Sequence, residues 1–473
     1  MIDDEISEGV DMDDWEESDD DDDDESTGSG EIHDEIVDKF IRNFHNGDYD
    51  TEFDNALCAD RSAVLPNTQP TQASYNKPDN WVERNRIGLE KVKEQLQTCI
   101  DSVTRDNSFN LELTHNVNSF LDQLMDNEEP IVWHEPILDE YWGRLEAEID
   151  RRKQLDNVTA DIERIHIENV EMKEERLAAL LAIFRSGRAT NSCKNVTFSN
   201  TNFCGKGIVW LAKLVDVSVE MNMLLLLHNR IDSMDSARYL SRSLRSHACI
   251  TRLHLDHCDL GSNPEMLSVI LQSEVKNIYL GSNNIDSVGS VTIAEYLEGN
   301  PPIDRIELDC NRLNDDNAIL ISQALKRNTH LRHLDFEGNN LTSIGVKALL
   351  NCVFDSSSLN AISESNHTLI YMYLFPDLNL FPEGGNKSLR GCVDRLLELD
   401  CTQKILLALR DKESLLKYLA NVPVLAFPLR RVDTQHRYNN LNLLYSIMRW
   451  WNMPMLYSYH CCVKSDTKRK RDN

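Results

Sequence analysis

The chain has 473 residues, of which 41% are hydrophobic, and this is enough apolar material for more than one packed unit. Its formal net charge of −30 and its lack of basic stripes with interleaved aromatic residues argue against nucleic acid as a partner. No run of 18 apolar residues and no secretion signal is present, so we expect no membrane span and an intracellular protein with free thiols.

The chain begins with an acidic tail at residues 1–30, which contains sixteen Asp or Glu residues and no Lys or Arg. Because such dense like charges repel one another and little apolar surface can be buried, we expect the tail to be disordered. Residues 31–160 then show mostly helical spacing of apolar residues, with a polar, proline-containing loop at 46–80. We expect these helices to cover the N-terminal end of the domain that follows.

A repeated line follows, with copies 25 to 38 residues apart that begin at Ile162, Cys193, Met221, Ile250, Val275, Ile303, Leu331 and, more weakly, Leu369. Each copy carries two apolar residues two positions apart, such as Ile306 and Leu308, which predicts a short strand with one buried face. The second half of each copy has apolar residues at three- and four-residue spacing, which predicts a helix.

This strand–helix unit predicts a solenoid. One unit cannot bury both of its apolar faces, whereas stacked units bury them continuously. Because strands stack about 4.8 Å apart and helices roughly 10 Å apart, the stack must bend with its strands inside. We therefore expect an α/β solenoid of about eight repeats over residues 161–380, a horseshoe with an inner parallel sheet and outer helices.

A further position recurs three residues after the second apolar residue of the central copies, where the chain has Asn229, Cys258, Asn283, Asn311 and Asn339. A buried Asn there can bond the backbone of adjacent turns and form a ladder through the stack. Val170 and Thr201 take its place in the first two copies, which we expect to be capping turns.

The line resembles ribonuclease-inhibitor-type leucine-rich repeats, which follow the pattern L-x-x-L-x-L-x-x-N/C-x-L. That resemblance implies the horseshoe fold and, since some proteins of this type activate GTPases, a GTPase-activating role as one possibility. Much of residues 133–460 is also similar to a group of algal leucine-rich-repeat proteins, a likeness that implies no activity.

The C-terminal part is predicted to be helical over residues 381–460 and to end in a basic, disordered tail at 461–473. The helices, with Trp450 and Trp451, form either a cap on the last repeat or a separate docking site, and the cap is the simpler interpretation. The basic run Lys468–Arg471 is either a nuclear import signal or a solubilising tail, so the cytoplasm and the nucleus both stay open.

The sequence contains only incomplete matches to catalytic and metal-binding motifs. The segment Cys204–Gly207 lacks the upstream glycine and the following Ser or Thr of a phosphate loop. His254, His257 and Cys258 superficially suggest metal ligands, but strand alternation places Cys258 at the buried ladder position. We therefore expect no enzymatic activity, no cofactor and no metal.

The inner sheet face is the best candidate for a binding surface. Strand alternation places Glu307 beside Asp335 and Asp309 beside Glu337, and we expect these carboxylates to be exposed. Either water and Arg305 relieve their repulsion, or the patch awaits a basic partner. The full set of candidate partner-binding residues is Glu307, Asp309, Asp335, Glu337, Asp256, Tyr279, Tyr371 and Tyr373.

These patterns favour a non-enzymatic protein–protein interaction scaffold whose partner is an unknown protein, for which a basic character is one expectation. The acidic tail and the import-like run suggest an alternative, a nuclear acidic histone-chaperone-like binder, by analogy alone. A GTPase-activating protein is the third hypothesis, although the sequence offers no recognisable catalytic or water-positioning residue for it. The sequence does not indicate an oligomeric state.

Overall fold

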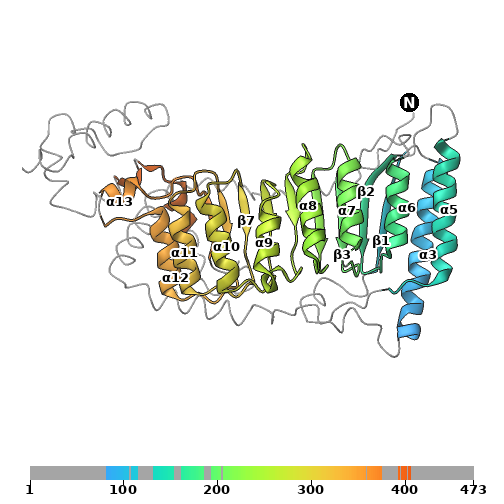
Figure 1. The fold of residues 1–473 in the computed structure, drawn as a ribbon, viewed down its shortest axis with the longest axis horizontal. Helices are drawn as coiled ribbons and strands as arrows, with labels where there is room; N and C mark the ends of the chain where they lie inside the picture. The colour runs from blue at the N-terminus through green and yellow to red at the C-terminus, as the bar shows by residue number, and fades with distance from the viewer. Residues whose placement is uncertain are drawn as a thin grey trace, which may run out of the picture.

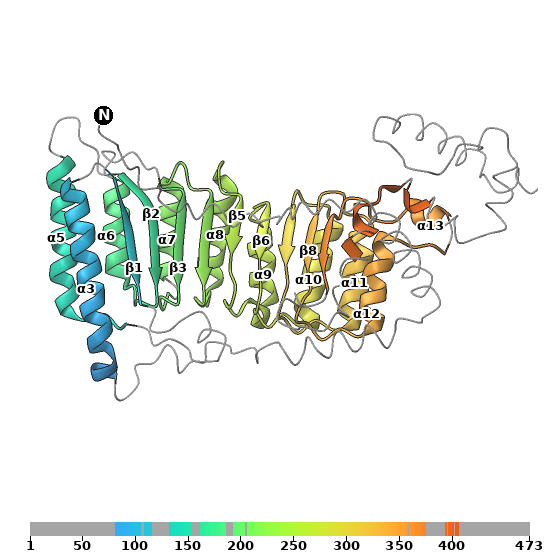
Figure 2. The same cartoon turned by 180° about the vertical axis from the view of Figure 1, so that it is seen from behind.

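The structure is a computed structural model that describes residues 81–105, 108–115, 132–153, 161–185, 193–203, 206–357, 359–374, 393–394, 396–401 and 403–405. Within these ranges the chain forms one open parallel sheet of nine strands, in the spatial order β1-β2-β3-β4-β5-β6-β7-β8-β9. Helices cover one face of the sheet (Figure 1), and the other face is turned away from them (Figure 2). We call this second face the inner sheet face.

The strands are short and evenly repeated, and their bounds are β1 (Ser108–Thr114), β2 (Asp161–Glu168), β3 (Asn195–Ser199), β4 (Met223–Leu227), β5 (Arg252–His254), β6 (Asn277–Tyr279), β7 (Arg305–Glu307), β8 (His333–Asp335) and β9 (Tyr371–Tyr373). The helices that follow β2 to β8 are α6 (Glu174–Arg185), α7 (Lys206–Val217), α8 (Met234–Ser246), α9 (Pro264–Leu271), α10 (Ser287–Glu298), α11 (Asp315–Leu325), α12 (Ser343–Val353) and α13 (Leu359–Ser363). A short 3₁₀ turn, η1 (Leu260–Ser262), precedes α9.

The eight predicted strands are β2 to β9, and the predicted pairs of apolar residues are buried in all of them. Each strand pairs in parallel with its neighbours in the sequence, and from α6 to α12 each helix packs against the next helix. The prediction of an α/β solenoid with an inner sheet is therefore confirmed. This alternation of parallel strands and helices fits a leucine-rich-repeat solenoid.

The sheet begins one strand earlier than the sequence analysis predicted. Strand β1 pairs in parallel with β2, and its Leu111 and Leu113 are fully buried. Two long helices, α3 (Trp81–Arg105) and α5 (Pro136–Lys153), pack on each other at this end of the solenoid, and α3 also packs on β1. The strand was missed because its alternating apolar residues stand in a region dominated by helical spacing.

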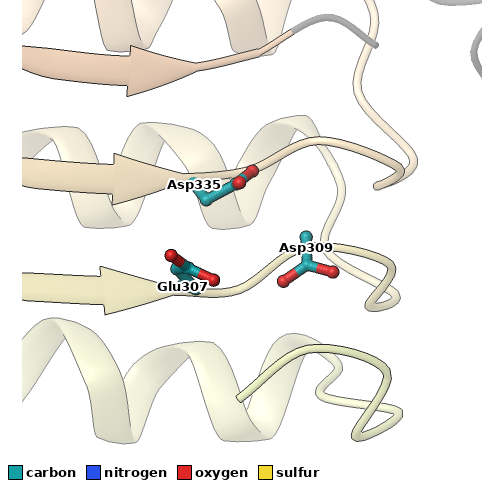
Figure 3. A group of neighbouring side chains, drawn as sticks. All are labelled: Glu307, Asp309 and Asp335. Atoms are coloured by element: carbon teal, nitrogen blue, oxygen red, sulfur yellow. The ribbon is translucent and has the colours of Figure 1, made fainter. Parts of the chain in front are cut away.

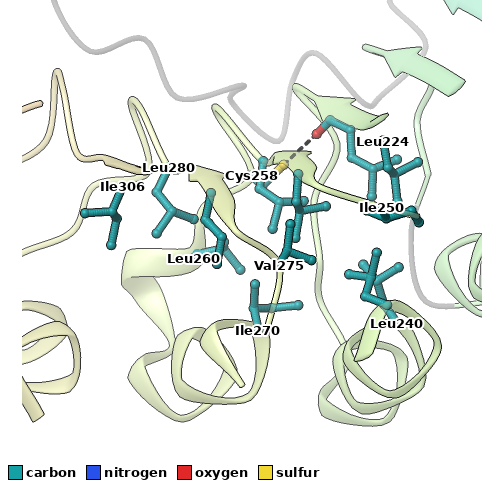
Figure 4. Packing of buried hydrophobic residues seen from close by; sticks show 14 of the residues in the cluster. Leu224, Leu240, Ile250, Cys258, Leu260, Ile270, Val275, Leu280 and Ile306 are labelled. Atoms are coloured by element: carbon teal, nitrogen blue, oxygen red, sulfur yellow. Dashed lines mark hydrogen bonds between the residues drawn. The ribbon is translucent and has the colours of Figure 1, made fainter. Parts of the chain in front are cut away.

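The core lies between the sheet and the helices. Figure 4 shows Leu224 and Leu280 from the sheet facing Leu240 and Ile270 from the helices. All four side chains are fully buried. Because every repeat gives one apolar face from its strand and one from its helix, the core runs without interruption along the stack.

The predicted amide ladder is present and links each turn to both of its neighbours. Asn311 is buried, its Nδ2 donates to the carbonyl oxygens of Leu280 (2.9 Å) and Leu308 (3.0 Å), and its Oδ1 accepts from the backbone N–H groups of Asn283 (3.0 Å) and Ile285 (2.9 Å). Asn339 donates in the same way to the Leu308 carbonyl at 2.8 Å. The amide thus satisfies backbone groups that a buried turn would otherwise leave without partners.

Cys258 takes the same place in the ladder with a thiol. Its Sγ donates to the Leu226 carbonyl oxygen at 2.8 Å (Figure 4). At Thr201 the hydroxyl and the backbone N–H both donate to Asn229 Oδ1, at 2.9 and 3.1 Å. The ladder therefore continues into the second repeat despite the change of residue.

A left-handed residue precedes each ladder position, and the sequence analysis did not identify this feature. Positive φ angles recur at Asn200 (49°), His228 (52°), His257 (57°), Ser282 (53°), Cys310 (51°) and Gly338 (69°). This conformation turns the chain out of the strand, and the N–H of the left-handed residue bonds to the next repeat, as from Cys310 to the Glu337 carbonyl at 2.8 Å. Only glycine adopts it without cost, so most repeats accept a small strain for this turn.

Several predictions concern residues outside the described ranges. They include both terminal tails, the loop at 46–80, the C-terminal helices after residue 405 with Trp450 and Trp451, and the possible import signal Lys468–Arg471. Among the helices that the structure does describe, none has the length and apolar character that a membrane span requires.

Replacing Asn311 with Ala should lower the free energy of unfolding by about 1–3 kcal/mol, because buried backbone groups of two repeats lose their partner. The matched control is Asn340→Ala, since the Asn340 side chain is exposed. Urea denaturation of both variants measures the difference. Equal midpoints for the two variants would show that the ladder contributes no stability.

Replacing Leu308 with Ala should lower the free energy of unfolding by about 2–5 kcal/mol, because the side chain is fully buried and its loss leaves a cavity in the continuous core. Val288→Ala on α10 serves as the control, as Val288 is 59% exposed. Thermal and chemical unfolding should separate the two variants. A Leu308 variant that melts with the parent would contradict the packing described above.

Candidate binding surface on the inner sheet face

The strand register arranges the side chains of the inner sheet face in rows that cross the strands. One row is fixed by the pairing of His254 with Tyr279, Tyr279 with Glu307, Glu307 with Asp335, and Asp335 with Tyr373. The pairing of Glu307 with Asp335 is the predicted one, because parallel strands without bulges keep equivalent positions side by side. The adjacent row contains Arg252, Asn277, Arg305, His333 and Tyr371.

Three carboxylates converge where β7 and β8 end. One oxygen each from Glu307, Asp309 and Asp335 lie within 4.8 Å of one another (Figure 3). Glu307 and Asp335 are register partners, and Asp309 stands two residues after Glu307, so its side chain returns to the same face of the chain. We call these three residues the acid cluster.

Two further predicted residues lie at the border of the acid cluster. The backbone N–H of Glu337 donates to Asp335 Oδ1 at 2.8 Å, and the N–H of Gly281 donates to Asp256 Oδ1 at 2.7 Å. A Cβ atom at Gly281 would lie 2.7 and 2.8 Å from the two Asp309 carboxylate oxygens and 2.9 Å from Asp256 Oδ1. The absence of a side chain at this glycine therefore lets Asp256 and Asp309 approach each other across β6.

The acid cluster is more deeply buried than the sequence analysis expected. The Glu307 side chain is only 24% exposed, and Asp309 and Asp335 are also half-buried. The correction has a simple cause: in a sheet of short strands, neighbouring side chains in a row cover one another. Alternation in the sequence tells which face a side chain is on, but not how much water reaches it.

Burial and mutual repulsion raise the pKa values of the acid cluster. Burial and then the Asp309 charge raise the pKa of Glu307 to about 7, against the opposing effect of Arg305, whose Nη1 donates to Glu307 Oε1 at 3.1 Å. Burial, and then the charge of Asp256, raise the pKa of Asp309 to about 6. Burial and the Asp309 charge raise the pKa of Asp335 well above its usual range.

Aromatic side chains flank the acid cluster on both sides. The rings of Tyr279 and His254 stack with centroids 3.6 Å apart, and the Arg305 guanidinium lies 6.0 Å from the Tyr279 centroid. Beyond the cluster, Tyr373 is the register partner of Asp335, and Tyr371 stacks on His333 at 4.6 Å. The surface therefore combines concentrated negative charge with flat rings, both of which attract cations.

The inner sheet face also has an apolar part, which the alternation of polar and apolar residues does not indicate. Leu225 and Leu227 of β4 point to the inner sheet face and are half-buried there, because strand β4 is apolar at all five of its positions. Alternating polarity, the signal used for the other strands, is absent from this one. Leu225 is the register partner of His254, so the apolar part adjoins the aromatic one.

His254, His257 and Cys258 are not brought together as metal ligands. Cys258 is buried in the core and bonded to a carbonyl, and burial raises the pKa of its thiol. His257 instead stacks on His228, with ring centroids 4.0 Å apart, and burial lowers the pKa of His228 to about 3. Carboxylates such as those of the acid cluster are donors that Ca²⁺ and Mg²⁺ prefer, but an acidic group alone does not define a metal site, and we assign none.

Comparisons with known proteins add little to this geometry. No protein-family profile matches the sequence, and no curated protein matches it either. Among solved structures the chain is similar to the Leiomodin-1 Actin-Binding Site 2 (ABS2), at 15% sequence identity and a TM-score of 0.23, over 45% of this chain and 94% of that one. A likeness at this level carries no argument about function.

The raised pKa of Glu307 predicts a pH-dependent stability. Its folded-state pKa of about 7 exceeds the ordinary value of 4.5, so the stabilising protonated form is fully present below about pH 4.5 and is lost as the pH rises through 7. The Glu307→Gln variant cannot ionise, so its free energy of unfolding should exceed that of the parent by an amount that grows between pH 5 and pH 8 and reaches about 1–3 kcal/mol. Urea denaturation across this range measures the gain, and a difference that does not change with pH would contradict the shift.

Proposed function

We propose that this protein is a non-enzymatic interaction scaffold that binds a basic protein partner through its inner sheet face. The observation that carries the proposal is the acid cluster, in which three half-buried carboxylates converge within 4.8 Å. Such an arrangement disfavours its own ionised form, and a partner's cation would relieve that cost.

Charge complementarity supports a basic partner over a neutral one. Within the described residues, the cation in contact with the acid cluster is Arg305, which donates to Glu307. One guanidinium cannot balance three carboxylates, so a Lys or Arg side chain from a partner would find acceptors left over at Asp309 and Asp335. Hydrogen bonds between ionised groups are stronger than neutral ones, and this favours specific docking.

The surroundings of the acid cluster suit a protein surface as partner. Tyr279, Tyr371 and Tyr373 offer broad amphipathic rings, the residue type enriched in protein interfaces. Tyr371 is 40% exposed in this structure, so it is available for contact. Leu225 and Leu227 add an apolar stretch on the same face.

A ribonuclease-inhibitor type of repeat is part of this proposal. It is supported by the full-length helix in most repeats and by the Asn or Cys ladder, since both features belong to that pattern. Extended inner faces of repeat solenoids serve as binding surfaces in many proteins, which fits a scaffold rather than an enzyme.

The two alternative functions stay predictions. A nuclear histone-chaperone-like role would use residues 1–30 and Lys468–Arg471, which lie outside the described residues. A GTPase-activating role would require a residue that positions water or stabilises the transferred phosphoryl group, and no observation on the inner sheet face favours one.

The experiment compares the parent with a variant that keeps the shape of the acid cluster but removes charge, Asp309→Asn with Asp335→Asn. Charge reversal to Lys at Glu307 and Asp335 is less suitable, because both side chains are half-buried. Glu295→Gln, an exposed change on α10, is the control. Affinity capture from cell extract identifies candidate partners, and calorimetry with each purified partner measures binding at several salt concentrations.

We expect the parent and the control to bind the same basic protein, with an affinity that falls as salt rises. The double variant should bind at least tenfold more weakly while unfolding at the parent's midpoint or above it. Equal binding by all three proteins would place the interaction outside the acid cluster and contradict the proposal.

A further inference from the structure

We propose that the acid cluster holds at least one proton in the free protein at neutral pH and releases it when a cationic side chain docks, so that binding tightens as the pH rises. This inference rests on the proposed function, because it describes how the same surface would respond to its partner. It makes the inner sheet face a pH-sensitive binding surface.

The geometry gives the first reason. Three carboxylate oxygens within 4.8 Å of one another, on half-buried side chains, are close enough for each negative charge to disfavour the next. Asp256 approaches Asp309 from the far side of Gly281, which adds a fourth negative group nearby. Full ionisation would therefore place adjacent negative charges where little water screens them.

The charged and titratable groups that face the acid cluster do not supply enough positive charge. They are His254 and Asp256 from β5 and its turn, Tyr279 from β6, Arg305 from β7, His333 and Glu337 from β8 and its turn, and Tyr371 and Tyr373 from β9. Arg305 donates to Glu307. His254 lies 3.7 Å from Asp256, and His333 lies 3.9 Å from Asp304, so each imidazole is directed toward another carboxylate.

Protons are the remaining way to reduce the charge in the free protein. The pKa of Glu307 is raised to about 7 and that of Asp309 to about 6, with burial as the first cause in both. Because the three groups interact, the midpoints belong to the cluster as a whole and not to single residues. At pH 6.5 the cluster is thus partly protonated.

A docking cation reverses this balance. A guanidinium or ammonium group beside the carboxylates favours their ionised form, so a carboxyl O–H bond breaks and its proton passes to the solvent. If one proton is released for each cation bound, the affinity should rise about tenfold for each pH unit below the cluster's midpoints. The dependence should disappear above about pH 8, where the free cluster is already ionised.

A capped tetra-arginine peptide, acetylated and amidated at its ends, is the probe for this coupling. The guanidinium group keeps its proton throughout the range, so any proton released on binding comes from the protein. Calorimetric titrations at pH 6.5, in buffers of different ionisation enthalpy and with EDTA present, count the protons. Full-length parent, Asp309→Asn with Asp335→Asn, and the control Glu295→Gln are compared.

We expect the parent and the control to release about one proton per peptide at pH 6.5 and close to none at pH 8.5. The double variant should bind at least tenfold more weakly and release fewer protons than the parent at pH 6.5. If its unfolding midpoint shows that the double variant does not fold, the single variant Glu307→Gln replaces it with the same expected direction.

A second measurement separates the two hypotheses. Carboxyl-detected NMR titration of the free parent should show Glu or Asp resonances with midpoints between about pH 6 and 7. In the double variant the Asp309 and Asp335 resonances are absent, and the Glu307 midpoint should fall because the charge of Asp309 no longer raises it. Ordinary midpoints, or peptide binding without proton release, would overturn the coupling and leave the proposed function standing. Raised midpoints without any peptide binding would overturn the proposed function and, with it, the coupling.

Discussion

The buried ladder of amide and thiol groups is the interaction on which the rest of this structure depends. Asn311 receives two N–H groups from the preceding repeat and donates to carbonyls in both turns, so it fixes the distance and the register between them. Because every strand is then held opposite the same position of its neighbour, the side chains of the inner sheet face must form straight rows. The acid cluster is a consequence of this register, since a slip of one residue would turn Glu307 and Asp335 toward the core.

The same constraint explains why an unfavourable charge cluster can persist. The free energy that holds the strands in place comes from the continuous core and from the ladder, on the other side of the sheet. Removing repulsion between Glu307 and Asp335 by moving the strands would break that packing across several repeats. The carboxylates therefore stay close together, Arg305 offsets part of their repulsion, and their pKa values are raised.

Much of the fold could be predicted from the sequence because its signal is repeated. Pairs such as Ile306 and Leu308 recur at nearly constant intervals, so errors at one copy are corrected by the others. Strand β1 was missed because its Leu111 and Leu113 stand alone, outside that period. The left-handed residues were missed for a different reason: His228, Ser282 and Cys310 have no common side-chain chemistry, and only the backbone unites them.

For the candidate site, the alternation of residues predicted which face each side chain lies on, but not its surroundings. Alternation correctly placed Glu307 beside Asp335, and the observed register adds Tyr279 and Tyr373 to the same row. It could not show the depth of burial, which depends on the size of neighbours from other repeats. Nor could it show that Gly281 leaves room for Asp256 and Asp309 to approach each other, because that depends on three strands at once.

The separation of the two sheet faces explains how the inner sheet face can acquire specificity for a partner without loss of the fold. Residues at the buried positions, such as Leu334 and Phe336, must fit neighbours on every side, and few replacements preserve that packing. Asp335 stands between them on the opposite face, where the backbone is already fixed and a new side chain changes mainly the surface. From β4 to β8 this freedom produces an apolar stretch at Leu225, stacked rings at Tyr279, and then the acid cluster, all on one regular backbone. A partner that lies across the strands would contact the apolar stretch first, then the stacked rings and then the acid cluster. Because neighbouring strands are evenly spaced, the order of the strands along the chain sets the order of these contacts.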